Sequence, residues 1–292
     1  MAKLAARNPD SAPGDWYVDT ACIDCGASRN VAPGLVVRRH ELSVFARQPA
    51  TSEEELAAWR AALVCPTASI GRTAHGRPPR GLYPHELAPG VFRCGYNARS
   101  SFGAHSYFVR RDGGNLLVDS PRFTRELAAR FEEMGGLADI LLTHRDDVAD
   151  AGRFAAHFGA RLWIHAADRD AAPFASQILT GVEPTAIRDG FLAIPVPGHT
   201  RGSVVFLLDE QYLFSGDSLA WSFERDDLQA FREACWYSWE EQTRSLARLA
   251  GHRFEWVLAG HGGSMHRSAE EMRARLIDLV NRGSPCSRSC SQ

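Results

Sequence analysis

The pattern of apolar and polar positions changes near residue 91. Beyond that point, short apolar runs alternate with amphipathic segments whose apolar positions recur every three to four residues, as is typical of strands alternating with helices. We expect strands over 105–111, 115–119, 138–143, 161–164, 191–196, 203–208, 211–215 and 255–259. We expect helices over 122–134, 149–158, 238–250 and 268–281, the last two opening with the capping boxes Ser238/Glu241 and Ser268/Glu271. Strands and helices mixed in this way predict a layered α/β fold.

The residues before 91 follow a second pattern. A helix is predicted to start at Ser52, whose spacing to Glu55 forms a capping box. It should end near Cys65, because Pro66 disfavours helical backbone in the residue before it. The stretch after it is rich in glycine and proline, which favours a linker. The predicted organisation is a flexible leader (1–15), a small domain (16–72), a linker (73–90), a larger domain (91–281) and a disordered tail (282–292).

Composition and charge narrow the class of protein. The chain has 292 residues, enough for one large domain or two smaller ones, and its 45% apolar and 23% charged residues argue against a disordered or collagen-like chain. A formal net charge of −2 provides no basic field that would indicate nucleic acid or a membrane as partner. No segment resembles a signal peptide or a membrane helix, so we expect a cytoplasmic protein. The 7 scattered cysteines, beside 11 histidines, suit a reducing compartment with thiols free to bind metal.

Four of the apolar runs after residue 91 end in residues that can bind a metal ion. Loops at strand ends lie along one edge of a sheet, where a rigid scaffold can hold several side chains together. Imidazole and carboxylate ligands suit zinc or iron. The candidates are His144, Asp146 and Asp147 after ADILL, His199 after FLAIPVP, Asp217 after YLF and His261 after WVLA.

The motifs THRDD, PGHTRGS, FSGDSL and AGHGG, in this order, resemble the metallo-β-lactamase superfamily over roughly 91–281. The resemblance implies an αββα sandwich of two mixed sheets with a metal site at one edge. The first motif departs from the family, because Asp146 stands where a second histidine is usual, and Val148 and Ala149 stand at two further ligand positions. Valine and alanine cannot bind metal.

The departure leaves a reduced set of metal ligands. Our first hypothesis is a mononuclear centre whose ligands are His144, Asp146, His199 and Asp217. His261 then orients substrate or binds a weak second ion, and a two-metal site is the second alternative. Asp147 and Asp150 are nearby carboxylates that can substitute for the missing ligands if the loop is reshaped. With an acidic residue two positions after the first histidine, the motif also resembles that of the flavodiiron branch of the superfamily. This resemblance implies iron rather than zinc.

The predicted small domain, residues 16–72, contains a cysteine motif. Cys22 and Cys25, followed much later by Cys65 before a proline, resemble a single-cluster bacterial ferredoxin, in which four cysteines bind one iron–sulfur cluster. Ser28 stands at the third cysteine position. The resemblance implies a small α+β domain with strands flanking the motif. It also implies a 3Fe-4S or 4Fe-4S cluster held by Cys22, Cys25 and Cys65, completed by Ser28 or an external ligand. The alternative is a domain that has lost its cluster and serves packing or dimerisation.

Other candidates carry weaker patterns. Cys235 lies among aromatic residues that form either a wall of the site or part of the core. His165 and Asp168 follow a predicted strand and are expected to be structural. Cys286 and Cys290 fall in the predicted disordered tail.

Three functions remain open. The first is a metal-dependent hydrolase that cleaves a small ester, thioester, lactone or amide through a metal-activated water, with Asp217 or Asp146 orienting the water and His261 donating a proton. The second is an iron-dependent redox enzyme that receives electrons from the N-terminal cluster and so needs an electron donor or acceptor. The third is a non-catalytic protein with decayed metal sites. A homodimer is compatible with each.

Overall fold

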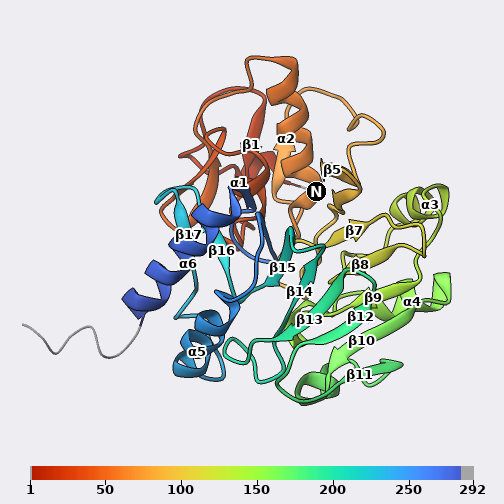
Figure 1. The fold of residues 1–292 in the computed structure, drawn as a ribbon. Coiled ribbons are helices and arrows are strands. Elements are labelled where there is room, and N and C mark those ends of the chain that lie inside the picture. Colours follow the sequence, from red (N-terminus) through yellow and green to blue (C-terminus); the bar gives the residue numbers. More distant parts are fainter. Residues whose placement is uncertain (1, 284–292) are drawn as a thin grey trace, which may run out of the picture. The chain divides into compact units, whose positions relative to one another are not determined.

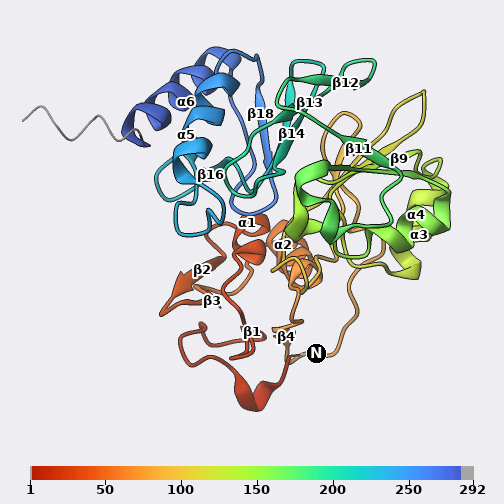
Figure 2. The ribbon, with the colours of Figure 1, turned by 90° about the horizontal axis from the view of Figure 1, so that it is seen from below.

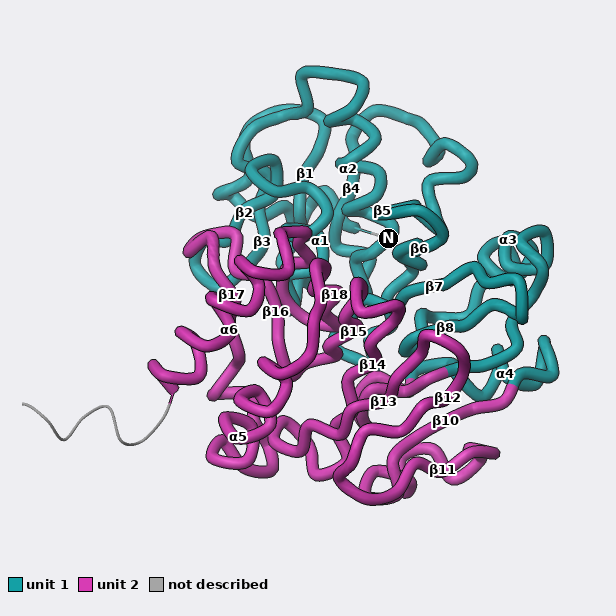
Figure 3. Tube along the Cα trace, in the orientation of Figure 1, with its two compact units in different colours: residues 1–140, 149–160 teal, residues 141–148, 161–292 magenta. Residues whose placement is uncertain are grey.

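The computed structural model describes residues 2–283 and divides the chain into two compact units (Figure 3). Unit 1 comprises residues 1–140 and 149–160, and unit 2 comprises residues 141–148 and 161–292. The predicted domain boundaries at 72, 91 and 281 remain a prediction. The predicted tail cysteines Cys286 and Cys290 lie outside the described residues.

The first part of unit 1 is a small α+β arrangement around the cysteine motif (Figures 1 and 2). Strand β1 pairs antiparallel with β4, so the strands expected on either side of the motif form as predicted. A core of Trp16, Phe45, Ala58 and Ile70 lies between them and the helices, with Cys22 and Cys65 packed against it. The elements are β1 (Trp16–Val18), α1 (Ala27–Val31), β2 (Val36–Arg39), β3 (Leu42–Phe45), α2 (Ser52–Val64) and β4 (Ile70–Arg72).

Helix α2 begins at Ser52 as predicted, but the residue that caps it is Thr51. The N-cap is Thr51, whose side chain accepts the backbone N–H of Glu54 at 3.2 Å. The carboxylate of Glu54 in turn accepts the backbone N–H of Ala50 at 2.7 Å. The predicted box of Ser52 and Glu55 is therefore wrong, because two overlapping Ser/Thr-x-x-Glu patterns occur here and the preceding threonine has the extended backbone that a cap requires.

The N-terminal segment expected to be a flexible leader makes specific contacts in unit 1. A 3-10 turn, η1 (Leu4–Ala6), precedes a backbone bond from Asn8 to Val18 at 2.8 Å. The Arg7 guanidinium donates to the Gly14 and Ala12 carbonyls. These bonds tie the segment to strand β1.

The rest of unit 1 is a run of strands, antiparallel from β5 to β8, with two helices. Within the unit, the strands follow the order β9-β8-β7-β6-β5, and Phe108, Phe131 and Phe154 stack in the core beneath α3 and α4. The elements are β5 (His85–Ala88), β6 (Val91–Arg93), β7 (Tyr107–Val109), β8 (Leu116–Val118), α3 (Arg125–Glu133), β9 (Asp139–Leu141) and α4 (Ala151–Phe158).

Strand β5 lies inside the segment expected to be a linker. It pairs antiparallel with β6 and is the last strand of its sheet, flanked by Pro84 and Pro89. Edge strands tolerate neighbouring prolines because one side of the strand needs no ladder hydrogen bonds. The segment expected to be a linker therefore contains a regular element, the edge strand β5.

Unit 2 contains a parallel pair of strands, a larger mixed sheet and two helices (Figure 1). The larger sheet follows the order β12-β13-β14-β15-β18-β19, and the core beneath α5 and α6 contains Leu213, Trp221, Leu246, Val257 and Leu276. The elements are η2 (Arg145–Asp147), β10 (Arg161–His165), η3 (Ala166–Ala171), β11 (Gln177–Leu179), β12 (Thr185–Arg188), β13 (Phe191–Pro195), β14 (Val204–Leu208), β15 (Tyr212–Gly216), β16 (Ala220–Ser222), β17 (Asp227–Gln229), α5 (Trp239–Leu249), β18 (Trp256–Ala259), β19 (Met265–His266) and α6 (Ala269–Gly283).

Both later capping boxes form as predicted. Ser238 accepts the backbone N–H of Glu241, and Ser268 accepts that of Glu271, each at 3.2 Å. The sheets flanked by helices confirm the predicted α/β class. Among residues 2–283, no helix has the length and apolar character needed to cross a membrane.

Candidate metal centre

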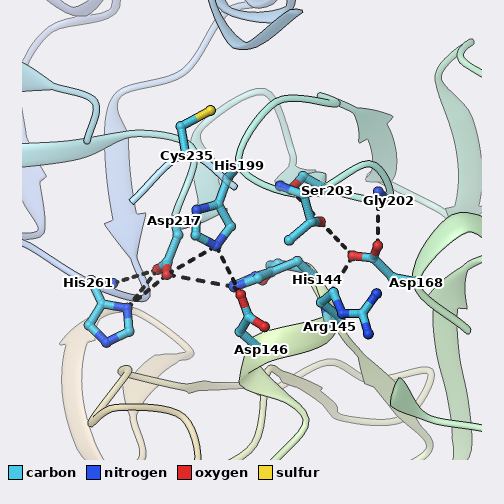
Figure 4. Close-up of polar contacts among 12 residues, drawn as sticks. His144, Arg145, Asp146, Asp168, His199, Gly202, Ser203, Asp217, Cys235 and His261 are labelled. Atoms are coloured by element: carbon cyan, nitrogen blue, oxygen red, sulfur yellow. Dashed lines mark hydrogen bonds and ion pairs between the residues drawn. The ribbon is translucent and has the colours of Figure 1, made fainter. Parts of the chain in front are cut away.

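Four loops at the ends of strands bring their polar side chains together in unit 2 (Figure 4). His144 follows β9, His199 follows β13, Asp217 follows β15 and His261 follows β18. The sequence predicted each of these four positions. The loops after β13, β15 and β18 leave the same edge of one sheet, because these three strands run in the same direction. Such edges commonly carry functional side chains.

His144, His199 and Asp217 form one close group. Their ligand atoms lie within 4.8 Å of one another. The Nε2 atoms of His144 and His199 are 3.6 and 3.7 Å from Oδ2 of Asp217. A tetrahedral ion with bonds of about 2.1 Å separates its ligands by about 3.4 Å, so this spacing fits one ion.

Asp146 completes this group on the side of the two histidines. Its Oδ2 lies 3.4 Å from Nε2 of His199 and 3.9 Å from Nε2 of His144. The nearby imidazole of His199 lowers the pKa of Asp146 below its usual value, so the side chain is a carboxylate at neutral pH. The residue that replaces the family histidine therefore remains beside the same two imidazoles.

The buried nitrogen atoms test whether these residues suit a cation. Nε2 of His144 and Nε2 of His199 are both inaccessible to solvent and make no hydrogen bond with any described residue. Leaving a buried polar atom without a partner is costly, so a native protein normally pairs it. Two buried imidazole nitrogens beside two carboxylates therefore provide ligands that suit a divalent ion.

The protonation state of His144 agrees with this interpretation, and the charges around His199 are those that attract a cation. Burial lowers the pKa of His144 to about 4, which keeps its imidazole neutral and able to bind metal. Burial lowers the pKa of His199 as well, but the carboxylates of Asp146 and Asp217 raise it above its usual value. Burial would raise the pKa of Asp217, yet His261, His144 and His199 together hold it well below its usual range.

A second group shares Asp217. It consists of Asp147, Asp217 and His261, with ligand atoms within 4.8 Å of one another. Gly260 makes room for it, because a Cβ there would lie 2.8 Å from an oxygen of each of Asp147 and Asp217. Among the described residues, neither group includes Asp150, whose carboxylate accepts the backbone N–H of Phe123 at 2.7 Å.

His261 and Asp217 contact each other directly in the second group. Nδ1 of His261 lies 2.9 Å from both carboxylate oxygens of Asp217, and the backbone N–H of His261 donates to Oδ1 at 3.0 Å. These bonds fix the plane of the carboxylate. They favour His261 as a residue that orients Asp217.

Asp168, which the sequence indicated only as a structural residue after a strand, ties these loops together. Asp168, in η3, is 1% exposed and accepts bonds from the Arg145 backbone at 3.0 Å, the Thr200 hydroxyl at 2.5 Å and the Gly202 backbone at 3.1 Å. It therefore joins the loop of His144 to the loop of His199 (Figure 4). Its neighbour His165 caps η3 as a structural residue. No local pattern marks Asp168, because its partners come from two other motifs.

Two further side chains hold the His199 loop from the other side. Oε1 of Gln242 accepts the backbone N–H of His199 at 2.6 Å, and Sγ of Cys235 donates to the Gly198 carbonyl at 3.1 Å. The backbone N–H of Trp236 donates to the His199 carbonyl at 2.9 Å, and its ring centroid lies 6.2 Å from that of His199. Trp236 is 68% exposed, so it forms an accessible aromatic surface beside a candidate ligand.

The predicted cluster cysteines lie together in unit 1. Burial raises the pKa of Cys25 to about 11, and the nearby Cys65 and Cys22 raise it further. Each sulfur accepts a backbone N–H, Cys22 from Ser43 at 3.5 Å, Cys65 from Ser69 at 3.2 Å and Cys25 from Ala27. Such bonds are typical of sulfurs that bind iron, whose redox potential they tune. Ser28 is buried in α1, three residues beyond Cys25.

Two parts of the chain each match a known protein family. Residues 18–72 match the family described as the 4Fe-4S single cluster domain of ferredoxin I, and residues 92–281 match the metallo-beta-lactamase superfamily. Among curated relatives, a hydroxyacylglutathione hydrolase of Fuscovulum blasticum is 37% identical over 111 residues, and one of Acidiphilium cryptum is 32% identical over 119 residues. These segments cover 37% and 39% of this chain but only 44% and 49% of the relatives.

Solved structures agree on the fold of the larger segment. The metallo-beta-lactamase DIM-1 aligns with a TM-score of 0.52 at 17% identity, over 68% of this chain and 97% of that one. A metallo-beta-lactamase from Hirschia baltica aligns with a TM-score of 0.51 at 14% identity, over 67% and 96%. The fold, the order of the four motifs and the match over residues 92–281 show that this chain belongs to the metallo-beta-lactamase superfamily.

Proposed function

We propose that this chain is a metal-dependent hydrolase that holds one divalent ion through His144, Asp146, His199 and Asp217. The observation that supports the site is the pair of buried Nε2 atoms, neither of them hydrogen-bonded, that face the carboxylate of Asp217. An ion bound there, zinc or iron, would polarise a substrate carbonyl and lower the pKa of a water molecule.

The protein's own residues then have separate roles. Asp217 stays anionic and is fixed by His261, so it can accept a hydrogen bond from the attacking water in one orientation. The side chain of Asp146 is 44% exposed, so a water molecule can reach its carboxylate. His261, whose side chain is 19% exposed, is placed to donate a proton to the leaving group.

The substrate class follows from the relatives and from the surface beside the site. We favour a small thioester over an ester, lactone or amide, because hydroxyacylglutathione, named in the relatives, is a thioester. The exposed ring of Trp236 offers an apolar contact for the acyl group next to His199.

A comparison of two aspartate variants tests this function. Asp217→Asn should lower kcat/KM on a panel of thioesters by more than roughly 100-fold, since even residues that only support a metal ligand cost 10-fold to 100-fold. Asp278→Asn, on the exposed face of α6, serves as the control and should match the wild type. Thioester hydrolysis that survives both chelation and Asp217→Asn contradicts the proposal.

A second function is supported by the sulfur environment in unit 1. An iron-dependent redox enzyme would place iron at Asp146 and its histidines. It would exchange electrons with a donor or acceptor through a cluster bound by Cys22, Cys25 and Cys65, with Ser28 at the third motif position. The backbone N–H groups that surround the three sulfurs support such a cluster.

One measurement separates the functions. Metal analysis and an absorption spectrum of anaerobically purified protein should show iron and sulfide if the cluster is bound, and zinc or iron at the hydrolase site. A colourless protein that contains only zinc contradicts the redox function. A protein without stoichiometric metal would instead support the non-catalytic hypothesis.

A further inference from the structure

The loop between β6 and β7 approaches the cysteine motif from outside the segment that matches the ferredoxin family. Its turn, residues 97–105, lies far along the chain from residues 18–72. At Gly103 a Cβ would lie 2.8 Å from Sγ of Cys25, 3.1 Å from Cβ of Cys25 and 3.0 Å from Cγ of Pro66, the residue that follows Cys65. The turn therefore touches the surroundings of two of the three cysteines.

The turn is held rigidly in this position. The Gly103 backbone N–H donates to the Ala98 carbonyl at 2.9 Å, and Nδ2 of Asn97 donates to the Gly103 carbonyl at 2.7 Å. Asn97 and His105 are 2% and 1% exposed, and Nδ2 of Asn97 lies 3.1 Å from Nδ1 of His105. A buried network of this kind restricts movement of the backbone over Cys25.

Glycine is required at position 103 for two independent reasons. Its φ of +85° is a conformation that residues with a side chain rarely adopt. The space that a side chain would fill is already occupied by the Cys25 sulfur. Gly34 shares only the first property, because its φ is +74° and nothing lies within 4 Å of its Cβ position.

We propose that the turn at residues 97–105 is a wall of the cysteine pocket, and that Gly103 is a positioning residue that lets the turn cover the Cys25 sulfur. The turn holds Cys25 in place for the cluster and keeps water from that sulfur. This inference rests on the cluster suggested for the redox function. It extends the cluster site beyond the matched family segment.

The experiment compares Gly103→Ala with Gly34→Ala in the full-length protein. Both variants place a side chain at a positive φ, but only the first also displaces the sulfur. After anaerobic reconstitution with iron and sulfide, Gly103→Ala should contain roughly 10-fold less cluster by absorption and electron paramagnetic resonance. Gly34→Ala should match the wild type.

A second readout does not depend on the cluster. In the apoprotein, alkylation by iodoacetamide, followed by peptide mass spectrometry, should label Cys25 faster in Gly103→Ala than in the wild type or in Gly34→Ala. Asn97→Ala, which removes the bond to the Gly103 carbonyl without adding a side chain there, should shift the labelling in the same direction. Circular dichroism and the metal content of the hydrolase site report whether each variant folds.

The outcomes test the role of the turn separately from the presence of the cluster. Equal cluster content and equal Cys25 labelling in Gly103→Ala and Gly34→Ala would overturn the role of the turn. If the wild type binds no cluster, the cluster itself is refuted. Labelling of Cys25 then still decides whether the turn covers the sulfur.

Discussion

The carboxylate of Asp168 accepts a hydrogen bond from the Thr200 hydroxyl at 2.5 Å. Through this bond, and those from the Arg145 and Gly202 backbones, one buried carboxylate fixes two loops that carry candidate ligands. Such outer contacts orient metal ligands and commonly affect the affinity for the metal nearly as much as the ligands do.

Asp168→Asn should therefore weaken the proposed metal site. One Asp168 oxygen accepts from both Arg145 and Thr200, and an amide cannot reproduce all three acceptor positions. We expect a loss of about 10-fold to 100-fold in metal affinity, measured by competition with a chelating dye. Asp170→Asn is the matched control, since Asp170 is exposed and pairs with the Arg145 side chain. Equal metal affinity in the two variants would contradict this role.

Trp236→Ala should raise KM more than it lowers kcat. The ring lies beside His199 but is exposed, so its loss removes a surface for substrate and leaves the core intact. An aromatic contact of about 1 kcal/mol corresponds to roughly a fivefold change in KM. Phe174→Ala, at another exposed aromatic residue of unit 2, should leave the steady-state kinetics unchanged. A lower melting temperature for Trp236→Ala would indicate a structural role instead.

Removal of metal should destabilise the protein. The buried Nε2 atoms of His144 and His199 lose their partner when the ion leaves, and an ion that binds only the native state contributes about 4 kcal/mol at 1,000 times its Kd. Chelation should therefore lower the melting temperature by several degrees, and added zinc or iron should restore it. The double variant His144→Ala/His199→Ala should show no response to chelation.

Ser28→Cys should complete the ferredoxin pattern. With a fourth thiolate at the third motif position, the reconstituted protein should show the absorption and electron paramagnetic resonance signals of a 4Fe-4S cluster and should resist oxygen better. Cys65→Ser should change cluster content in the opposite direction. A Ser28→Cys protein that binds no more iron than the wild type would refute Ser28 as the missing cluster ligand.

The stability of the protein should contain a contribution from His85 that depends on pH. Burial lowers the pKa of His85 to about 4, with the nearby Arg60 and Arg93 adding to the effect. The unfolded chain then binds more protons than the native protein between about pH 4 and 6.5, so this contribution falls as the pH falls through that range. His85→Asn should flatten the dependence of melting temperature on pH there. His40→Asn, at an exposed histidine, should not.

Much of the fold could be predicted because it rests on local rules. The helices and strands expected over residues 91–283 lie close to their predicted positions, and the caps at Ser238 and Ser268 form as their spacing indicates. The short strands β6, β11, β12, β16, β17 and β19 were not predicted. Two predictions failed where local rules were ambiguous. Thr51 precedes Ser52 in an equally good cap pattern, and strand β5 lies between prolines that a strand tolerates only at the edge of a sheet.

The candidate site was predictable only in part. His144, His199, Asp217 and His261 each follow an apolar run, so the order of the motifs identified them. Asp147, however, lies near Asp217 because η2 turns its carboxylate inward, whereas the equally plausible Asp150 bonds to Phe123 instead. A choice between neighbouring carboxylates depends on the path of the backbone.

The sequence by itself determined the α/β class, the two family segments and the residues able to bind metal, since these follow from periodicity and from short motifs. Only the tertiary structure decided which residues hold the candidate metal ligands and the cysteines in position. Asp168 bonds to Thr200, and Gly103 packs against Cys25, across long stretches of chain. The physical reason is that such contacts arise from the packing of whole elements, whereas a local pattern constrains only residues within a turn or two of each other.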